Sequence, residues 1–198
     1  MIPDGRVEAL RVPTPPGWAQ VALADLPATM SDHAHAEKKA ALSALSLLSR
    51  EPGRTALVAK MARLAREELR HLDQVLAHLR ARGWPLAPDR PDRYAGALLA
   101  LRRRGGRGDL VDRLLCAALI EARSWERLSL LGEALASTGH DLAAFYAQLA
   151  RSEAGHYRLF VDLAVTECPG EDVPARLREL AETEATIVLG LPHEPRIH

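Results

Sequence analysis

Residues 61–75 read Met61-Ala-Arg-Leu-Ala-Arg-Glu-Glu-Leu-Arg-His-Leu-Asp-Gln-Val75, and this stretch decides the fold that the sequence predicts. Its apolar residues recur at the spacing of one face of an amphipathic helix: Met61, Leu64, Leu72 and Val75. Glu68 and His71 lie on the same face, about one turn apart. The stretch therefore predicts a helix that directs a carboxylate and an imidazole into the core.

The same Glu-x-x-His pattern occurs a second time, at Glu153 and His156, again among apolar residues at helical spacing. Two further predicted helices each carry one glutamate on their apolar face, Glu37 and Glu121. Glu37 precedes Glu68 by 31 residues, and Glu121 precedes Glu153 by 32. The chain thus repeats one order in its two halves, a single Glu followed by Glu-x-x-His.

Four carboxylates in one core need a positive partner, because burying a charge without compensation costs several kcal/mol. Two metal ions would neutralise them, and carboxylates combined with imidazoles suit iron or manganese. The same ligand set occurs in ferritin-like dimetal proteins. The sequence predicts these six residues as metal ligands: Glu37, Glu68, His71, Glu121, Glu153 and His156.

Composition independently favours an all-α fold. Apolar residues make up 47% of the 198 residues, yet aromatic residues only 4%, and Leu and Ala dominate. Residues 1–28 are rich in proline and are expected to be irregular. Beyond them, helices are expected at about 31–50, 55–82, 94–104, 110–137, 141–167 and 174–189.

The four longest of these helices form two pairs with short internal connections. The link between the pairs covers about 27 residues, 83–109, and carries the short helix. This layout predicts a single ferritin-like diiron domain over residues 1–198. Its architecture would be a four-helix bundle with a long crossover and an extra C-terminal helix.

At this level of detail the chain resembles the tRNA hydroxylase family known as MiaE. The resemblance runs from about residue 25 to the C-terminus and rests on four stretches: Leu64–His71, Leu110–Leu115, Ile120–Arg127 and Phe145–His156. The block Ile120-Glu-Ala-Arg-Ser124 is more specific than the metal motifs, which alone indicate only a ferritin-like protein. Trp125 departs from the family pattern, which has a smaller residue there.

The resemblance implies a nonhaem diiron monooxygenase that uses O2. Its substrate would be the isopentenyl group of 2-methylthio-N6-isopentenyladenosine, next to the anticodon in tRNA. It also implies that Glu68 and Glu153 bridge two iron ions, with Glu37 and Glu121 as terminal ligands. His71 and His156 would each bind one iron. Such a reaction needs an external electron donor, so a separate reductase is expected as a partner.

Weaker signals concern positively charged and titratable residues elsewhere. A basic connection at residues 102–107 is a candidate for contacts with tRNA phosphates, and a solvated loop is the alternative. Its candidate residues are Arg102, Arg103, Arg104 and Arg107. His33 and His35 are expected at the surface near a helix start, with a metal role as the alternative. Glu184 is expected on a solvated face, with a position near the metal site as the alternative. Arg123 and Glu126 flank Glu121 and are candidates for contacts that orient the ligands.

Charge and hydropathy limit the other function classes. The 26 basic and 26 acidic residues give zero net charge, which argues against nonspecific coating of nucleic acid. No apolar run is long enough to span a bilayer, so no membrane association is expected. Cys116 and Cys168 read as reduced thiols, which favours a cytoplasmic location. The balanced charge is compatible with a monomer.

Two other functions share the predicted metal site. An iron-oxidising storage protein usually assembles into a cage from compact, even bundles, and the long crossover and extra helix argue against this. A diiron oxygenase that acts on a small molecule or an acyl chain would differ only in its pocket and partner. Retention on tRNA is the observation that separates this enzyme from the tRNA hydroxylase.

Overall fold

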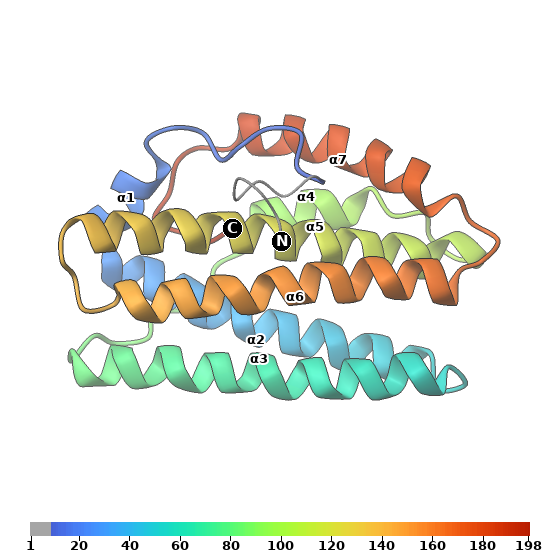
Figure 1. Ribbon diagram of the computed structural model, residues 1–198, viewed down its shortest axis with the longest axis horizontal. Helices are drawn as coiled ribbons and strands as arrows, with labels where there is room; N and C mark the ends of the chain where they lie inside the picture. Colours follow the sequence, from blue (N-terminus) through green and yellow to red (C-terminus); the bar gives the residue numbers. More distant parts are fainter. Residues whose placement is uncertain (1–8) are drawn as a thin grey trace. The chain divides into compact units, whose positions relative to one another are not determined.

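The computed structural model describes residues 9–198, apart from the side chain of Arg107, and this part of the chain is all-helical (Figure 1). Its seven helices are α1 (Trp18–Ala24), α2 (Leu26–Arg50), α3 (Thr55–Ala81), α4 (Arg93–Ala100), α5 (Arg107–Ser137), α6 (Ala143–Glu167) and α7 (Val173–Gly190). None of the helices in the described part is both long and apolar enough to cross a membrane. The expected all-α class is therefore confirmed.

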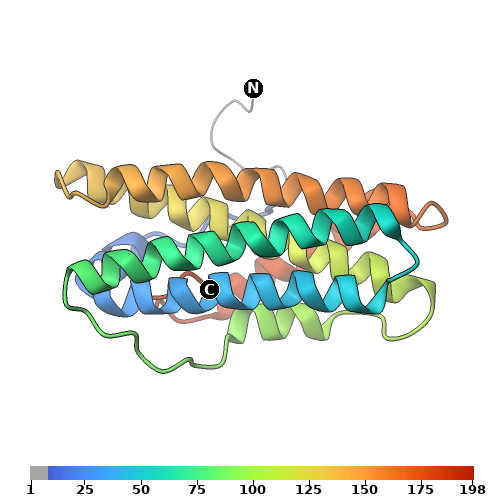
Figure 2. The same cartoon turned by 90° about the horizontal axis from the view of Figure 1, so that it is seen from below.

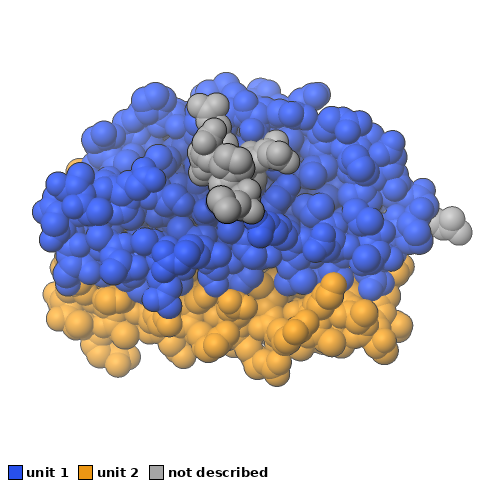
Figure 3. All heavy atoms as spheres, in the orientation of Figure 1, with its two compact units in different colours: residues 1–23, 91–194, 198 blue, residues 24–90, 195–197 orange. Residues whose placement is uncertain are grey.

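The chain folds as two compact units, which Figure 3 colours separately. One comprises residues 24–90 and 195–197, and contains the helical hairpin α2–α3. The other comprises residues 1–23, 91–194 and 198, and contains α1, α4, the hairpin α5–α6 and α7. Each unit thus holds one of the two long hairpins, whose partner helices run side by side in Figures 1 and 2.

Helix formation begins earlier than the sequence pattern predicted. Residues 1–28 were expected to be irregular, but α1 starts at Trp18 and α2 at Leu26. The early start of α2 has a local cause. The Asp25 carboxylate accepts a hydrogen bond from the Ala28 amide at 3.1 Å and caps α2. Pro27 suits the first turn of a helix, where its missing N–H is not needed. Residues 1–8 lie outside the described part of the chain.

The hairpin α2–α3 packs through small and aliphatic side chains. The buried face of α2 carries Met30, Ala34, Ala41, Ala44 and Leu47, and that of α3 carries Leu57, Met61, Leu64, Val75 and Leu79. Glu51-Pro52-Gly53 forms the turn, as expected from the sequence, and the Glu51 amide donates to the Leu47 carbonyl. The hairpin therefore presents one continuous apolar interior, on which Glu37, Glu68 and His71 lie.

The hairpin α5–α6 relies on one close approach between helices. A Cβ atom placed on Gly132 of α5 would lie 3.3 Å from the backbone nitrogen of Ala147 in α6, closer than most real Cβ contacts. Glycine at this position therefore lets the two helix backbones approach each other. Helix α7 contacts both α4 and α5 within the same unit.

Candidate metal centre

In the α2–α3 unit, Glu37, Glu68 and His71 converge on one buried point. Their relative exposures are 5%, 0% and 7%, respectively. His71 Nδ1 lies 3.2 Å from Glu68 Oε2 and 3.5 Å from Glu37 Oε2. One donor atom from each residue lies within 4.8 Å of the others. The i, i+3 spacing on α3 and the pairing of α2 with α3 thus produce three potential ligands around a common centre.

His33 joins this group, although a surface position was expected for it. The side chain is buried, with 1% relative exposure, and its Nε2 lies 2.8 Å from Glu37 Oε1. The physical reason is the early start of α2 at Leu26, which places His33 in the second turn, four residues before Glu37 and on the same inner face. His35 does point elsewhere, since its Nε2 lies 2.8 Å from the Ala87 carbonyl oxygen.

In the α5–α6 unit, Glu121, Glu153 and His156 form the corresponding group. All three are buried, at 6%, 3% and 4% relative exposure. His156 Nδ1 lies 3.0 Å from Glu153 Oε2, and one donor atom from each of the three lies within 4.8 Å of the others. The repeat read from the sequence is therefore a repeat in structure, with one Glu and one Glu-x-x-His inside each hairpin.

The chemistry of these groups fits metal binding. Hard carboxylate oxygens and neutral imidazole nitrogens are ligands for iron and manganese, and buried carboxylates are normally neutralised by a cation. Two carboxylates and one imidazole per hairpin match the ligand set of helical dimetal proteins. Both groups lie on rigid helices, which position ligands more accurately than loops do.

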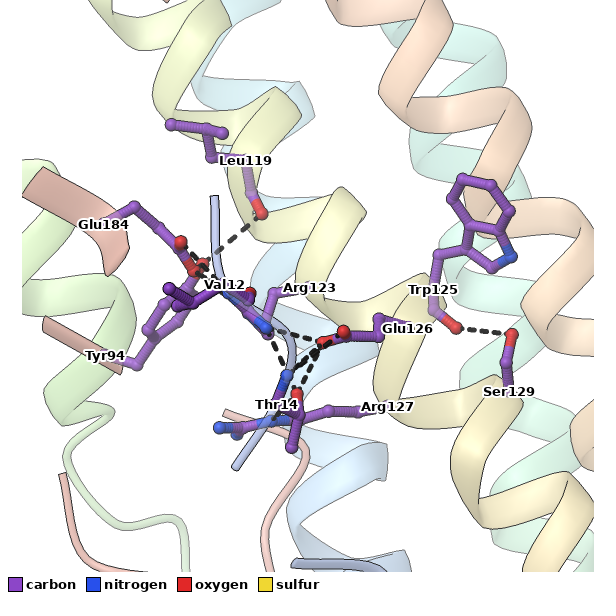
Figure 4. A network of polar contacts seen from close by, with 10 residues as sticks. All are labelled: Val12, Thr14, Tyr94, Leu119, Arg123, Trp125, Glu126, Arg127, Ser129 and Glu184. Atoms are coloured by element: carbon purple, nitrogen blue, oxygen red, sulfur yellow. Dashed lines mark hydrogen bonds and ion pairs between the residues drawn. The ribbon is translucent and has the colours of Figure 1, made fainter. Parts of the chain in front are cut away.

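A second buried polar cluster occurs beside Glu121, around Arg123 on α5 (Figure 4). Arg123 and Glu184 of α7 are both fully buried, and the Arg123 Nη2 atom donates to Glu184 Oε1 at 2.8 Å and Oε2 at 3.0 Å. The Tyr94 hydroxyl also donates to Glu184 Oε1, at 2.8 Å. Burial, followed by the negative charge of Glu184, raises the pKa of Tyr94 well above its ordinary value. The solvated position expected for Glu184 is therefore wrong.

The cluster extends to the N-terminal segment through Glu126. Its carboxylate accepts from the Thr14 amide at 3.0 Å and from the Thr14 hydroxyl at 2.6 Å, and Arg123 Nη2 donates to the Val12 carbonyl (Figure 4). Arg123 and Glu126 were singled out from the sequence, but their partners were not. A partner far away in the sequence produces no periodic pattern and could not be predicted. The i, i+3 spacing of Arg123 and Glu126, in contrast, places them next to each other on one helix face.

The described arginine side chains of the basic connection at residues 102–107 differ in their contacts. Arg103 makes ion pairs with Asp112 at 2.8 Å and Glu171 at 3.0 Å, and Arg176 pairs with Asp112 from α7. Burial opposes ionisation of Asp112, but hydrogen bonds from Arg176 and Arg103 outweigh it and lower its pKa to about 2. Arg102 donates to the Leu99 carbonyl, and Arg104 is exposed. The Arg107 side chain lies outside the described part.

The fold and the two Glu/Glu-x-x-His groups define a helical carboxylate–histidine protein of the ferritin-like class. Within that class, a family model described as tRNA-(MS[2]IO[6]A)-hydroxylase (MiaE) matches residues 3–198. The chain belongs to this family. The resemblance stated from the sequence is thereby confirmed.

Relatives from three organisms are similar over most of the chain. A Pseudomonas putida protein named tRNA 2-(methylsulfanyl)-N(6)-isopentenyladenosine(37) hydroxylase is 39% identical over 96% of this chain and 91% of its own length. A Salmonella typhimurium protein of the same name is 38% identical over 75% of this chain and 53% of its own length. A solved structure, "Protein 43 with aldehyde deformylating oxygenase activity from Synechococcus", is 36% identical.

The Synechococcus structure superposes with a TM-score of 0.88, covering 97% of this chain and 96% of its own. Together with the element order, this likeness confirms the ferritin-like fold expected from the sequence. The expected long crossover with a short helix, and the additional C-terminal helix, correspond to residues 82–106 with α4, and to α7.

Proposed function

We propose that this protein is a nonhaem diiron monooxygenase of tRNA. It would hydroxylate the isopentenyl group of 2-methylthio-N6-isopentenyladenosine at position 37, next to the anticodon. The observation that carries the proposal is the family match over residues 3–198 in a chain whose two hairpins each bury a Glu/Glu-x-x-His group. The names of the Pseudomonas and Salmonella relatives supply the substrate.

Six residues would hold the two iron ions. Following the family resemblance, Glu37, Glu68 and His71 would supply ligands from the α2–α3 hairpin, and Glu121, Glu153 and His156 would supply ligands from the α5–α6 hairpin. The burial and mutual distances within each hairpin support this assignment. When bound, the iron pair supplies the reduction of O2 and the transfer of one oxygen atom to an unactivated C–H bond.

The chain itself contributes orientation and exclusion of water. The candidate ligands project from long helices, and their neighbours on the buried faces are apolar, for example Met61, Leu64 and Phe160. Such surroundings keep bulk water away from the reacting carbon and strengthen electrostatic interactions with the ligands. Incorporating one oxygen atom of O2 and reducing the other to water consumes two electrons, so a separate reductase is the proposed partner.

For the tRNA itself, the exposed Arg104 and the half-buried Arg102 are the proposed phosphate contacts, together with Arg107. Arg103 belongs to the same proposed set, although its ion pairs with Asp112 and Glu171 give it a structural task as well. A tRNA substrate would place the reaction in the cytoplasm.

A second candidate function is the O2-dependent deformylation of an aldehyde to a hydrocarbon and formate. The Synechococcus relative favours it, because its title names an aldehyde deformylating oxygenase activity and its fold covers 97% of this chain. This reaction would use the same metal ligands but a small apolar substrate in place of a nucleoside in RNA. The two candidates are therefore distinguished by substrate and not by metal content.

One experiment tests both candidates. The wild type and Glu68→Ala are loaded with ferrous iron without oxygen, and iron per chain is measured. Each protein is then given O2 and a reductant with isopentenylated tRNA or with a long-chain aldehyde. We expect two irons in the wild type, loss of iron in the variant, and one added oxygen in the nucleoside by mass spectrometry. A hydrocarbon one carbon shorter than the aldehyde, released together with formate while the tRNA stays unmodified, would favour the second candidate. Equal iron in both proteins would contradict the metal site.

A further inference from the structure

Besides His71, another histidine of the α2–α3 unit contacts a proposed ligand, and the Glu/Glu-x-x-His pattern does not account for it. His33 is buried, and its Nε2 lies 2.8 Å from Glu37 Oε1. We infer that His33 is a positioning residue. It fixes the Glu37 carboxylate so that its other oxygen, Oε2, serves as a ligand of one iron ion. The inference rests on the proposed metal site and adds a residue that the Glu/Glu-x-x-His pattern does not contain.

The direction of the hydrogen bond follows from the partners. As a metal ligand Glu37 would be ionised, and an ionised carboxylate can only accept hydrogen bonds, so His33 Nε2–H would be the donor to Glu37 Oε1. Hydrogen bonds to ionised groups are short and strong compared with neutral ones. This bond therefore holds one carboxylate oxygen of Glu37 and fixes the rotation of the carboxylate plane.

The second oxygen is consequently directed at the other ligands. Glu37 Oε2 lies 3.5 Å from His71 Nδ1, and His71 Nδ1 lies 3.2 Å from Glu68 Oε2. With Oε1 engaged by His33, Oε2 is the oxygen that faces the centre of the group. Glu37 is thereby set to bind through one oxygen, as expected of a terminal ligand.

The two halves of the chain differ at this point. Glu37 has His33 four residues earlier on its helix, whereas the residue four positions before Glu121 is Ala117, whose methyl group donates no hydrogen bond. His33 thus has no counterpart in the sequence repeat. A histidine-to-apolar substitution at position 33 should therefore affect one of the two metal ions and leave the other unchanged.

Two variants at position 33, His33→Leu and His33→Gln, test this inference. Both replacements have similar size and fill the buried space, but only glutamine retains an N–H donor. His35→Leu is the matched control, because His35 lies on the same helix and contacts the Ala87 carbonyl instead of a carboxylate. Circular dichroism of the metal-free proteins checks that each variant is folded.

The readout is metal binding and does not require turnover. Cobalt(II) is titrated into each metal-free protein without oxygen, and the visible d–d absorption gives the number and affinity of the ions bound. We expect two ions in the wild type and in His35→Leu. In His33→Leu one of the two ions should bind about 10- to 100-fold more weakly, the typical loss when a residue that supports a metal ligand is changed. His33→Gln should recover most of that loss.

Three other results would overturn the inference. Unchanged affinity for both ions in His33→Leu would mean that Glu37 needs no support from position 33. Complete loss of one ion in both variants would make His33 a ligand itself. In a Glu37→Ala background, His33→Leu should have no further effect, and an additional loss there would show that it acts by another route. A wild type that binds no cobalt would instead contradict the metal site itself.

Discussion

Glu184 is a carboxylate at 0% exposure, and it is compatible with the fold only because Arg123 lies against it. Removing one member of such a pair leaves a buried charge without a counter-charge, or buried hydrogen-bond donors without an acceptor. This typically lowers stability by about 3–5 kcal/mol. The same rule explains why the pair has additional partners in Tyr94 and Glu126. The stability of this region is therefore concentrated in a few polar side chains.

We predict that Glu184→Gln lowers the free energy of unfolding by several kcal/mol. For a protein of this size each kcal/mol corresponds to roughly 2–4 °C in Tm, so thermal unfolding followed by circular dichroism should show a drop of about 6–15 °C. Glu182→Gln is the control, because Glu182 is exposed on the same helix. A Tm equal to that of the wild type in Glu184→Gln would contradict the importance of this ion pair.

At the residue level, helical periodicity was sufficient to predict that the six candidate ligands are buried. Glu68 and His71 are examples, because their apolar neighbours recur at three, four and seven positions. Their role as ligands stays a prediction. His33 and Glu184 were misjudged because each depends on something that periodicity does not contain: the start of a helix in one case and a partner 61 residues away in the other.

At the scale of the elements, one buried carboxylate accepts hydrogen bonds from both the end of the crossover and α7. Asp112 of α5 accepts hydrogen bonds from the Arg103 backbone at 2.7 Å and from its guanidinium, while Arg176 of α7 donates to it at 2.8 Å. Asp112 thus connects the crossover, α5 and α7. Burial disfavours its charge, but the hydrogen bonds from Arg176 and Arg103 lower its pKa from 3.8 to about 2.

This pKa shift predicts a specific loss of stability in acid. A carboxyl group with a depressed pKa in the folded state stabilises the protein above its unfolded pKa, here near 3.8, and loses that contribution as the pH falls through about 2. The contribution is on the order of 2 kcal/mol. Denaturant unfolding between pH 5 and pH 2 should show this decline in the wild type, and Asp112→Asn should lack it.

Asp109→Asn is the matched control for Asp112, because Asp109 is partly exposed and pairs with Arg113, one turn along the same helix. Its loss should change stability by a few tenths of a kcal/mol. If Asp112→Asn kept the full acid dependence of the wild type, other carboxylates would be responsible for it.

Helix positions were predictable within a few residues wherever a Gly or Pro marks the boundary. The ends of α2 and α6 at Arg50 and Glu167 agree with the sequence, because Glu51-Pro52-Gly53 and Cys168-Pro169-Gly170 follow them. The start of α2 was misplaced because several residues near it can cap a helix. Asp25 does so here, while Ser31 and Asp32 lie inside the helix.

On the scale of the whole molecule, zero net charge limits how RNA can be bound. A neutral surface gives little long-range attraction, so affinity has to come from a few local cations. We predict that Arg102→Ala combined with Arg104→Ala reduces the slope of log affinity for tRNA against log salt concentration by about 1.5. Thermal stability should stay nearly unchanged.

Two control variants separate a local effect of the loop from a general effect of charge and from a loss of stability. Arg63→Ala combined with Arg66→Ala removes the same charge from the exposed face of α3, and an equal change in slope would show that the effect is not local to the loop. Arg103→Ala is expected to lower stability as well as affinity, because Asp112 and Glu171 lose a partner.

Because each Glu/Glu-x-x-His group is confined to one hairpin, its members are separated by at most 34 or 35 residues in the sequence. Most contacts in a helical hairpin are local in sequence, which gives a low contact order and is associated with rapid folding. During translation the α2–α3 hairpin is complete before the ribosome has begun α5, since domains form from the N-terminus as the chain emerges. The first three acidic and histidine side chains can thus gather on the nascent chain before the second three have been synthesised.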